Sequence, residues 1–146
     1  MTPFRWRSRV YWEDTDGGGV VYYANYLKYL ERARTEWLRA RGVSQHSLAL
    51  ERGILFAVTS LRIDYRRPAR LDDELIVSCE PRPRGAAQVA FEQSIHRAPA
   101  PATEPEAPSA QLLVSAEVHV ACVHAQSFRP QRLPAFMLEA LAREPA

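Results

Sequence analysis

Two aspartates and three consecutive glycines form the stretch of the chain whose residue types best suit catalysis. Asp14 and Asp16 flank Thr15, and residues 17–19 are all glycine. Three glycines in a row indicate a backbone that takes unusual φ/ψ values or lets another group approach closely. A helical pattern begins a few residues later, so the turn lies beside the unpaired N–H groups and the positive dipole end of a helix. A carboxylate held there can attack a carbonyl while helix N–H groups stabilise the oxyanion.

Asp16 is the candidate catalytic carboxylate of this turn. It can act as a direct nucleophile or as a general base for water, and the sequence does not separate the two roles. The competing interpretation is structural, because an aspartate before glycines is often only a turn or capping residue. Asp14 points the opposite way if the preceding strand continues, so we expect it to orient the loop or to meet solvent.

Hydrophobic periodicity predicts the elements that must position this turn. Residues 5–13 alternate as a strand does, and from Tyr23 to about Gly42 the apolar residues fall at helical spacing, with Gly42 as the C′ glycine. Tyr26, Leu30, Ala33 and Trp37 form the apolar stripe of this helix that a sheet can cover. The other predicted elements are a short helix at 45–52 capped by Ser44, strands at 54–66, 74–80, 87–97 and 111–125, and a short helix at 135–141. Long strands in meander sequence favour antiparallel pairing. The whole chain, 1–146, is therefore predicted as one α+β domain with a sheet wrapped over a long helix.

Composition excludes several classes of protein. With 25% charged and 47% hydrophobic residues the chain resembles an ordinary soluble domain, and its net charge of +2 is too small to indicate nucleic-acid binding. No apolar run is long enough for a membrane span, and the charged residues 1–9 lack a signal core, which predicts a cytoplasmic location. Cys79 and Cys122 lie in strand-like apolar runs and are expected to be buried free thiols. Residues 98–110 contain four prolines and predict an exposed, mobile hairpin loop.

The four histidines do not suggest a second site. None has ligand spacing to another, none sits near a plausible nucleophilic serine or cysteine, and the two cysteines do not make a zinc site. No metal is therefore expected.

The stretch from Asp14 to Tyr26, continued by residues 29–36, resembles the signature of the 4-hydroxybenzoyl-CoA thioesterase group of hotdog-fold proteins. It is most similar to the Tol–Pal-associated acyl-CoA thioesterase branch, and residues 61–65 and 68–73 also match. The resemblance implies a hotdog fold, in which an antiparallel sheet wraps around one long central helix. It also implies a homodimer joined edge to edge, often a tetramer, an acyl-CoA substrate, and no cofactor besides the coenzyme A of the substrate.

The resemblance assigns roles within the turn. The family's catalytic carboxylate falls on Asp16, and the backbone N–H that polarises the thioester carbonyl falls on Tyr23. Gly18 and Gly19 would let that carbonyl approach the N–H groups of Tyr22 and Tyr23. Several relatives in this branch have a histidine at the position of Tyr23. The tyrosine of this chain leaves the role of the backbone amide intact but removes any imidazole contribution.

Four further residues are candidates for binding substrate. Tyr26 is expected in the core or in a dimer contact rather than as a wall of the acyl pocket, although it can serve as both. Glu31 lies about two helical turns after Tyr23, either as a second active-site carboxylate or as a surface charge paired with Arg34 or Thr35. Arg84 and Gly85 are the candidate turn for the CoA phosphates, which need fixed positive charge.

These observations favour an acyl-CoA thioesterase for short, medium or aromatic acyl groups. The alternative is a non-catalytic module that binds acyl-CoA or acyl carrier protein and is associated with envelope or phospholipid enzymes, which would not need Asp16. A hotdog dehydratase would place a histidine paired with a carboxylate near the helix start, where this chain has Tyr23.

Overall fold

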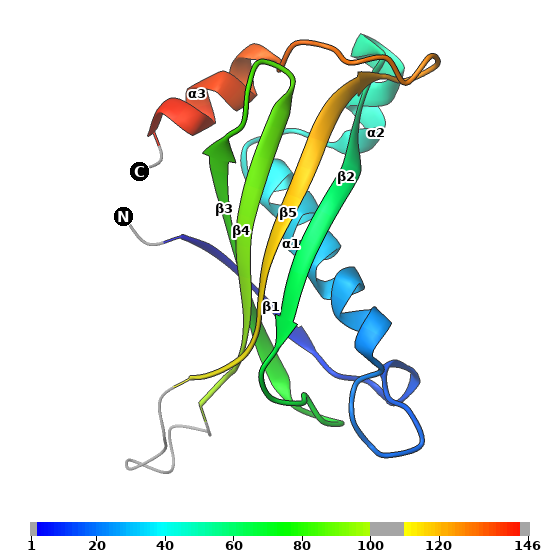
Figure 1. Ribbon diagram of the computed structural model, residues 1–146, viewed down its shortest axis with the longest axis vertical. Helices are drawn as coiled ribbons and strands as arrows, with labels where there is room; N and C mark the ends of the chain where they lie inside the picture. Colours follow the sequence, from blue (N-terminus) through cyan, green and yellow to red (C-terminus); the bar gives the residue numbers. More distant parts are fainter. Residues whose placement is uncertain (1–2, 100–109, 144–146) are drawn as a thin grey trace.

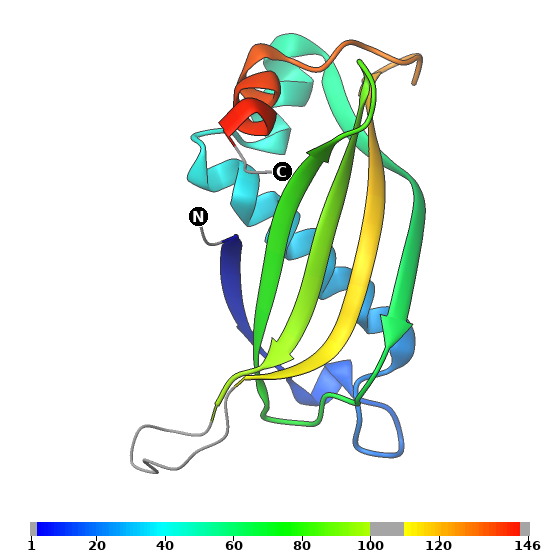
Figure 2. The same cartoon turned by 60° about the vertical axis from the view of Figure 1, so that its left-hand side comes forward.

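The structure is a computed structural model that describes residues 3–99 and 110–143. One antiparallel sheet of five strands has the order β1-β3-β4-β5-β2. Its strands are β1 (Phe4–Arg9), β2 (Ile54–Tyr65), β3 (Glu74–Pro83), β4 (Gln88–Arg97) and β5 (Gln111–His124). The long helix α1 (Tyr26–Ala40) lies across one face of this sheet (Figures 1 and 2). The predicted α+β class, with a sheet over a central helix, is confirmed.

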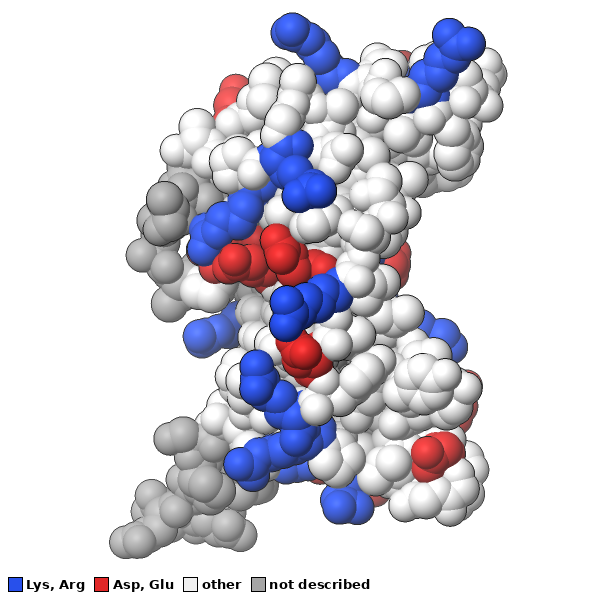
Figure 3. All heavy atoms as spheres, viewed as in Figure 1, with Lys and Arg blue, Asp and Glu red and all other residues white. Residues whose placement is uncertain are grey.

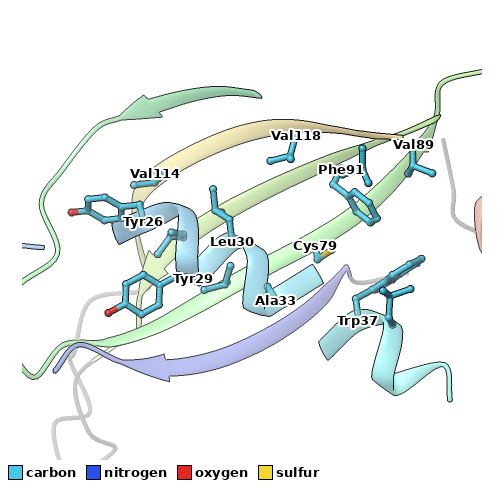
Figure 4. Close-up of a cluster of buried hydrophobic side chains, with 14 of the residues drawn as sticks. Tyr26, Tyr29, Leu30, Ala33, Trp37, Cys79, Val89, Phe91, Val114 and Val118 are labelled. Atoms are coloured by element: carbon cyan, nitrogen blue, oxygen red, sulfur yellow. The ribbon is translucent and has the colours of Figure 1, made fainter. Parts of the chain in front are cut away.

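The core lies between α1 and the sheet. The inward face of α1 carries the buried side chains Tyr26, Tyr29, Leu30, Ala33, Trp37 and Leu38. They meet alternate residues of the strands, including Cys79, Phe91 and Val118 (Figure 4). Trp37 packs edge-on against Phe91 with the ring centroids 5.5 Å apart. Burial of Tyr26 and Trp37 confirms their predicted place in the core, because helical spacing puts them on the face that the sheet covers.

Trp37 tests this packing. We expect Trp37→Ala to lower the free energy of unfolding by about 3–5 kcal/mol, since it removes a fully buried aromatic side chain and leaves a cavity. Urea denaturation measures the loss. Leu138→Ala is the matched control, because Leu138 is 53% exposed on helix α3 (Ala135–Arg143) and should change stability little. Equal losses in the two variants would contradict this description of the core.

The strand order corrects the predicted meander. β3, β4 and β5 do follow one another, but β2 pairs with β5 at the far edge of the sheet and not with β3. The connection from β2 to β3, residues 66–73, therefore runs across the end of the sheet, where it meets the glycine turn through the Val20–Arg70 bridge. Periodicity identifies strands but does not determine which strands are neighbours.

Two predicted strands have different ends. The strand predicted at 5–13 stops at Arg9, because the Tyr11 N–H donates to the Asp14 carboxylate and the chain turns into a 3-10 helix, η1 (Trp12–Asp14). The strand predicted at 74–80 continues to Pro83. Prolines are tolerated there because β1 pairs with β3 only as far as Cys79 and leaves that side of β3 without a ladder.

The helix ends follow the capping chemistry. Gly42 has φ +79° and Gly53 has φ +64°, the left-handed conformation expected of a glycine after a helix. The Ser44 hydroxyl accepts the Ser47 N–H at 3.0 Å and caps the short α2 (Gln45–Ser47), after which the chain continues as a π-helix, η3 (Leu48–Arg52). The start of the long helix is tighter than predicted, because residues Tyr23–Asn25 form a separate 3-10 turn, η2.

Other expectations concern smaller features. Cys79 and Cys122 are buried free thiols, as predicted. The predicted mobile loop at 98–110 falls mostly on residues 100–109, which lie outside the described residues. Within the described part of the chain, no helix has both the length and the apolar character needed to cross a membrane.

Candidate active site

Asp16 lies on an exposed loop that is closed by its own hydrogen bonds. Its N–H donates to the Val20 carbonyl at 2.8 Å, and its carbonyl accepts the Gly19 N–H at 3.1 Å. One carboxylate oxygen, Oδ1, accepts the Gly18 N–H at 2.7 Å. This bond from Gly18 is the turn-capping contact that a purely structural role for Asp16 would require. The same contact also fixes the direction of the carboxylate.

The three glycines serve different purposes. Gly19 has φ +78°, which side chains other than glycine rarely adopt. At Gly18 an added Cβ would lie 3.2 Å from Asp16 Oδ1, so a side chain there would press on the carboxylate. A Cβ at Gly17 would meet nothing within 4 Å. The need for glycine is therefore conformational at Gly19 and steric at Gly18.

Asp14 forms the base of the loop. It is 8% exposed and is one of two polar residues buried among the described part of the chain. Its Oδ2 accepts the Tyr29 hydroxyl at 2.7 Å and the Tyr11 N–H at 2.9 Å. Of the two expectations for Asp14, orienting the loop is therefore confirmed and exposure to solvent is wrong.

The two candidate oxyanion donors differ. The Tyr22 N–H donates to the Asp14 carbonyl at 3.0 Å, so this amide already has an acceptor within the loop. Tyr23 is the first residue of η2, a position whose N–H has no acceptor within its helix. The geometry thus favours the Tyr23 amide over the Tyr22 amide as a donor to an incoming oxyanion.

A groove of aromatic and basic residues lies beside Tyr23. It has a volume of about 290 Å³ and is lined by Val21, Tyr23, Tyr26, Tyr65, Arg66, Arg67 and Pro68. The Tyr65 hydroxyl donates to the Tyr23 carbonyl at 2.8 Å, and the Tyr26 hydroxyl accepts the Ala69 N–H at 3.0 Å. Burial raises the pKa of both Tyr26 and Tyr65. Nothing local to Arg66 and Arg67 in the sequence indicated the contact of this segment with Tyr23.

Glu31 lies on a different part of α1. Its carboxylate accepts the Thr35 hydroxyl at 2.9 Å, which is one of the surface pairings expected for it. It also lines a cavity of about 130 Å³ between α1, the sheet and α3, with Arg34 and Gln45 as the other polar residues. The rest of the lining is apolar: Leu38, Phe56, Val58, Phe91, Val120 and Met137. Glu31 therefore does not join the Asp16 loop within one chain. Its pairing with Thr35 is confirmed, and its role as a second active-site carboxylate stays a prediction.

The predicted phosphate turn lies at the other end of the sheet. Arg84 and Gly85 follow β3, whose ten residues begin near the Asp16 loop and span about 30 Å. Figure 1 shows the β3–β4 turn and the loop before α1 at opposite ends of the molecule. The Arg84 guanidinium donates to the Gln88 side chain at 3.1 Å, and Gly85 has φ +83°. One chain thus does not bring Arg84 to Asp16.

The outer face of the sheet is polar. Figure 3 shows acidic side chains gathered over its middle with arginines around them, and Arg82 forms ion pairs with both Glu80 and Glu92. The sequence predicted no histidine near a plausible nucleophilic serine, yet the structure brings one serine and one histidine into contact. Ser60 Oγ and His119 Nδ1 are 2.8 Å apart, since β2 pairs with β5 at this register. His119 Nε2 lies 3.3 Å from Glu117 Oε1, but the two atoms are not aligned for a hydrogen bond.

No metal centre is formed by the described side chains. Among residues 3–99 and 110–143, no three His, Cys, Asp or Glu side chains are grouped so that they could hold a metal ion.

The sheet wrapped over one helix, with a carboxylate loop at the helix start, defines a protein of the hotdog thioesterase class. The chain belongs to the Thioesterase-like superfamily, whose family model matches residues 10–141. The family membership and hotdog fold that the resemblance implied are confirmed.

Individual relatives cover nearly all of the chain. It is 43% identical over 133 residues to the acyl-CoA thioester hydrolase YbgC of Escherichia coli O6:H1, with 91% of each protein covered. A probable thioesterase from Bartonella henselae superposes with a TM-score of 0.79 at 33% identity, covering 91% of this chain and all of that one. The 1,4-dihydroxy-2-naphthoyl-CoA thioesterase from Synechocystis superposes with a TM-score of 0.84 at 26% identity, with 97% of each chain covered.

Proposed function

We propose that this protein is an acyl-CoA thioesterase that hydrolyses its substrate at the Asp16 loop. The observation that carries the proposal is the position of Asp16. Its carboxylate is oriented by the Gly18 N–H, and the loop leads into a helix whose first N–H group belongs to Tyr23. Thioester hydrolysis requires a nucleophile or base and a donor for the oxyanion, and these two groups supply both without a cofactor. Family membership and the thioester hydrolases among the relatives support the same reaction.

In the proposed reaction the thioester carbonyl oxygen accepts the Tyr23 N–H, and Gly18 and Gly19 leave room for its approach. Asp16 then either attacks the carbonyl carbon or removes a proton from the attacking water. Coenzyme A leaves as the thiol once it has gained a proton, and the acyl group leaves as a carboxylate. The acyl group is short, medium or aromatic. An acyl carrier protein partner and a cytoplasmic location are further parts of the proposal.

The active unit in this proposal is a homodimer, with a tetramer as its larger form. β2 pairs with β5 on one side only, so its outer side is a free sheet edge. Exposed apolar side chains run from the Asp16 loop along α1 and this edge: Tyr22, Tyr23, Leu27, Val58, Leu61 and Tyr65. A patch of this kind is typical of a surface that another protein covers. Covering it would exclude water from Asp16, which strengthens each electrostatic contact at the site.

Antiparallel pairing of two β2 strands has a consequence for the substrate. The end of β2 at Tyr65 in one subunit would lie beside the end that carries Phe56 in the other. The 130 Å³ cavity with Glu31 in its lining opens near Phe56, so we assign it to the acyl group of a thioester that is attacked by the second subunit's Asp16. In this arrangement Tyr26, in the aromatic groove, remains on the Asp16 side of the site.

The groove beside Tyr23 leads us to propose Arg66 and Arg67 as binding groups for the CoA phosphates, with Arg84 and Gly85 as the second candidate. We expect Arg66→Ala/Arg67→Ala to raise KM for acyl-CoA about tenfold with kcat unchanged, equivalent to about 1.4 kcal/mol of binding. Steady-state kinetics measures this effect. The N-acetylcysteamine thioester of the same acyl group lacks the phosphates, so its KM should not change.

Arg84→Ala provides the comparison within the same assay. A rise in KM for acyl-CoA in Arg84→Ala, with none in Arg66→Ala/Arg67→Ala, would move the phosphate site to the β3–β4 turn. A rise for both substrates in either variant would show that the arginines act on the fold of the site and not on the phosphates.

A further inference from the structure

Asp14 is buried, yet the proposed chemistry gives it no part. Its carboxylate lies beneath the loop that carries Asp16 and contacts α1 through the Tyr29 hydroxyl, 2.7 Å from Oδ2. Tyr29 itself is 1% exposed and belongs to the hydrophobic core cluster. Figure 4 shows its ring between α1 and the sheet, with the hydroxyl at the loop end of the helix. Burying a carboxylate costs free energy even when the carboxylate accepts two hydrogen bonds. The position of Asp14 is therefore expected to serve the structure or the site.

The backbone of Asp14 extends the same link to the other side of the loop. Its carbonyl accepts the Tyr22 N–H and the Asn25 side-chain N–H, both at 3.0 Å. Asp14 thus joins the start of the loop, the end of the loop and the 3-10 turn η2 that precedes α1. Asp16 lies between the two ends of the loop, and Tyr23 is the residue directly after the end of the loop at Tyr22.

We propose that Asp14 and Tyr29 are positioning residues for the hydrolysis, and that their hydrogen bond sets the Asp16 carboxylate at its working distance from the Tyr23 N–H. This inference rests on the proposed function of Asp16. Tyr29 is fixed by core packing, so its hydroxyl transmits the position of α1 to the loop. Burial and the neighbouring Asp14 raise the pKa of Tyr29, which keeps the phenol protonated as a donor. Neither residue touches the reacting atoms in this account.

Tyr29→Phe tests the link, since it removes the hydroxyl and keeps the ring. A small displacement of reacting groups reduces rate strongly, so we expect kcat to fall about tenfold or more with KM for acyl-CoA unchanged. The matched control is Ser78→Ala, which removes a partly buried hydroxyl that bridges to Ser94 between β3 and β4. It should lower the melting temperature by a similar amount and leave kcat unchanged. A Tyr29→Phe variant that loses only melting temperature would overturn the proposal.

Substitutions of Asp14 separate positioning from chemistry. Asn at this position keeps a side-chain oxygen that can accept from Tyr29 and Tyr11, whereas Ala keeps none. We expect Asp14→Asn to retain most of kcat and Asp14→Ala to lose about 10²-fold. If Asp14→Asn were as inactive as Asp14→Ala, the charge itself would be required and Asp14 would be a catalytic residue.

A measurement without substrate distinguishes this inference from the proposed function. Amide hydrogen exchange at Gly18 and Tyr22 should speed up in Tyr29→Phe and stay as in the unmodified protein in Ser78→Ala. If the unmodified protein hydrolysed no acyl-CoA, the proposed function would fail, while faster exchange would still support the link between α1 and the loop. Unchanged exchange at both amides would overturn the link whatever the activity.

Discussion

Replacing Asp16 with asparagine is expected to reduce kcat for acyl-CoA hydrolysis by about 10²–10⁴-fold, the usual contribution of a general base. The substitution is specific because asparagine also caps turns of this kind. Its side-chain oxygen can still accept the Gly18 N–H that Asp16 Oδ1 accepts at 2.7 Å. The loop should therefore keep its shape and lose only the negative charge. Hydrolysis followed by thiol release measures kcat, and circular dichroism and gel filtration check fold and assembly.

Glu13→Gln is the matched control for this experiment. Glu13 is an exposed carboxylate three residues away in the chain, in η1, and the proposed reaction does not use it. Its removal should leave kcat unchanged. Full activity in Asp16→Asn would overturn the proposed mechanism and require a different active carboxylate. A lack of hydrolysis in the unmodified protein would instead favour the non-catalytic module.

The same assay, run in H₂¹⁸O over many turnovers, separates the two roles of Asp16. A nucleophilic carboxylate forms a mixed anhydride with the acyl group. When water attacks that anhydride at the aspartyl carbon, the label enters Asp16 and mass spectrometry of the loop peptide detects it. A general base directs the labelled water to the acyl carbon, and the label then appears only in the released acid.

Placing a charge on the free edge of β2 is expected to have the second large effect. Leu61 is 40% exposed on the edge strand, within the apolar surface that we assign to the dimer. We expect Leu61→Arg to give monomers, since two buried like charges would face each other near the two-fold axis. Because the acyl cavity and Asp16 would then come from separate molecules, we expect kcat/KM to fall about 10²-fold or more. Light scattering coupled to gel filtration measures the assembly.

Leu138→Arg serves as the control for added charge. Leu138 is 53% exposed on α3 and does not belong to the proposed interface, so this variant should assemble and react normally. A monomeric Leu61→Arg variant with full activity would show that one chain holds a complete site. An active dimer in Leu61→Arg would place the interface elsewhere.

Much of the fold could be predicted because helices and strands follow from the spacing of apolar residues near one another in the sequence. The 3.6-residue spacing of Tyr26, Leu30, Ala33 and Trp37 identified the buried face of α1, and Gly42 marked its end. Alternation located all five strands, although β1 ended early. The early end came from a side-chain contact that alternation does not report, because the Asp14 carboxylate accepts the Tyr11 N–H that a longer strand would have used.

In the candidate site, too, contacts between near neighbours in the chain could be predicted and contacts between distant residues could not. Asp16, the glycines and the helix start are contiguous in the chain, so turn chemistry was enough to bring them together as a hypothesis. The bond between Tyr29 and Asp14 spans 15 positions, that between Tyr65 and Tyr23 spans 42, and that between Ser60 and His119 spans 59. No local pattern indicates such partners, because they depend on strand order and on the path of residues 66–73.

The sequence by itself therefore determined the reactive turn and the helix that follows it, since backbone conformation and capping act between near neighbours. The tertiary structure decided how that turn is held. It buried Asp14 against Tyr29, gave the Tyr22 N–H an acceptor and left the Tyr23 N–H at the start of a helix. It also separated Arg84 from Asp16 by the length of β3, a distance that only the packed sheet defines.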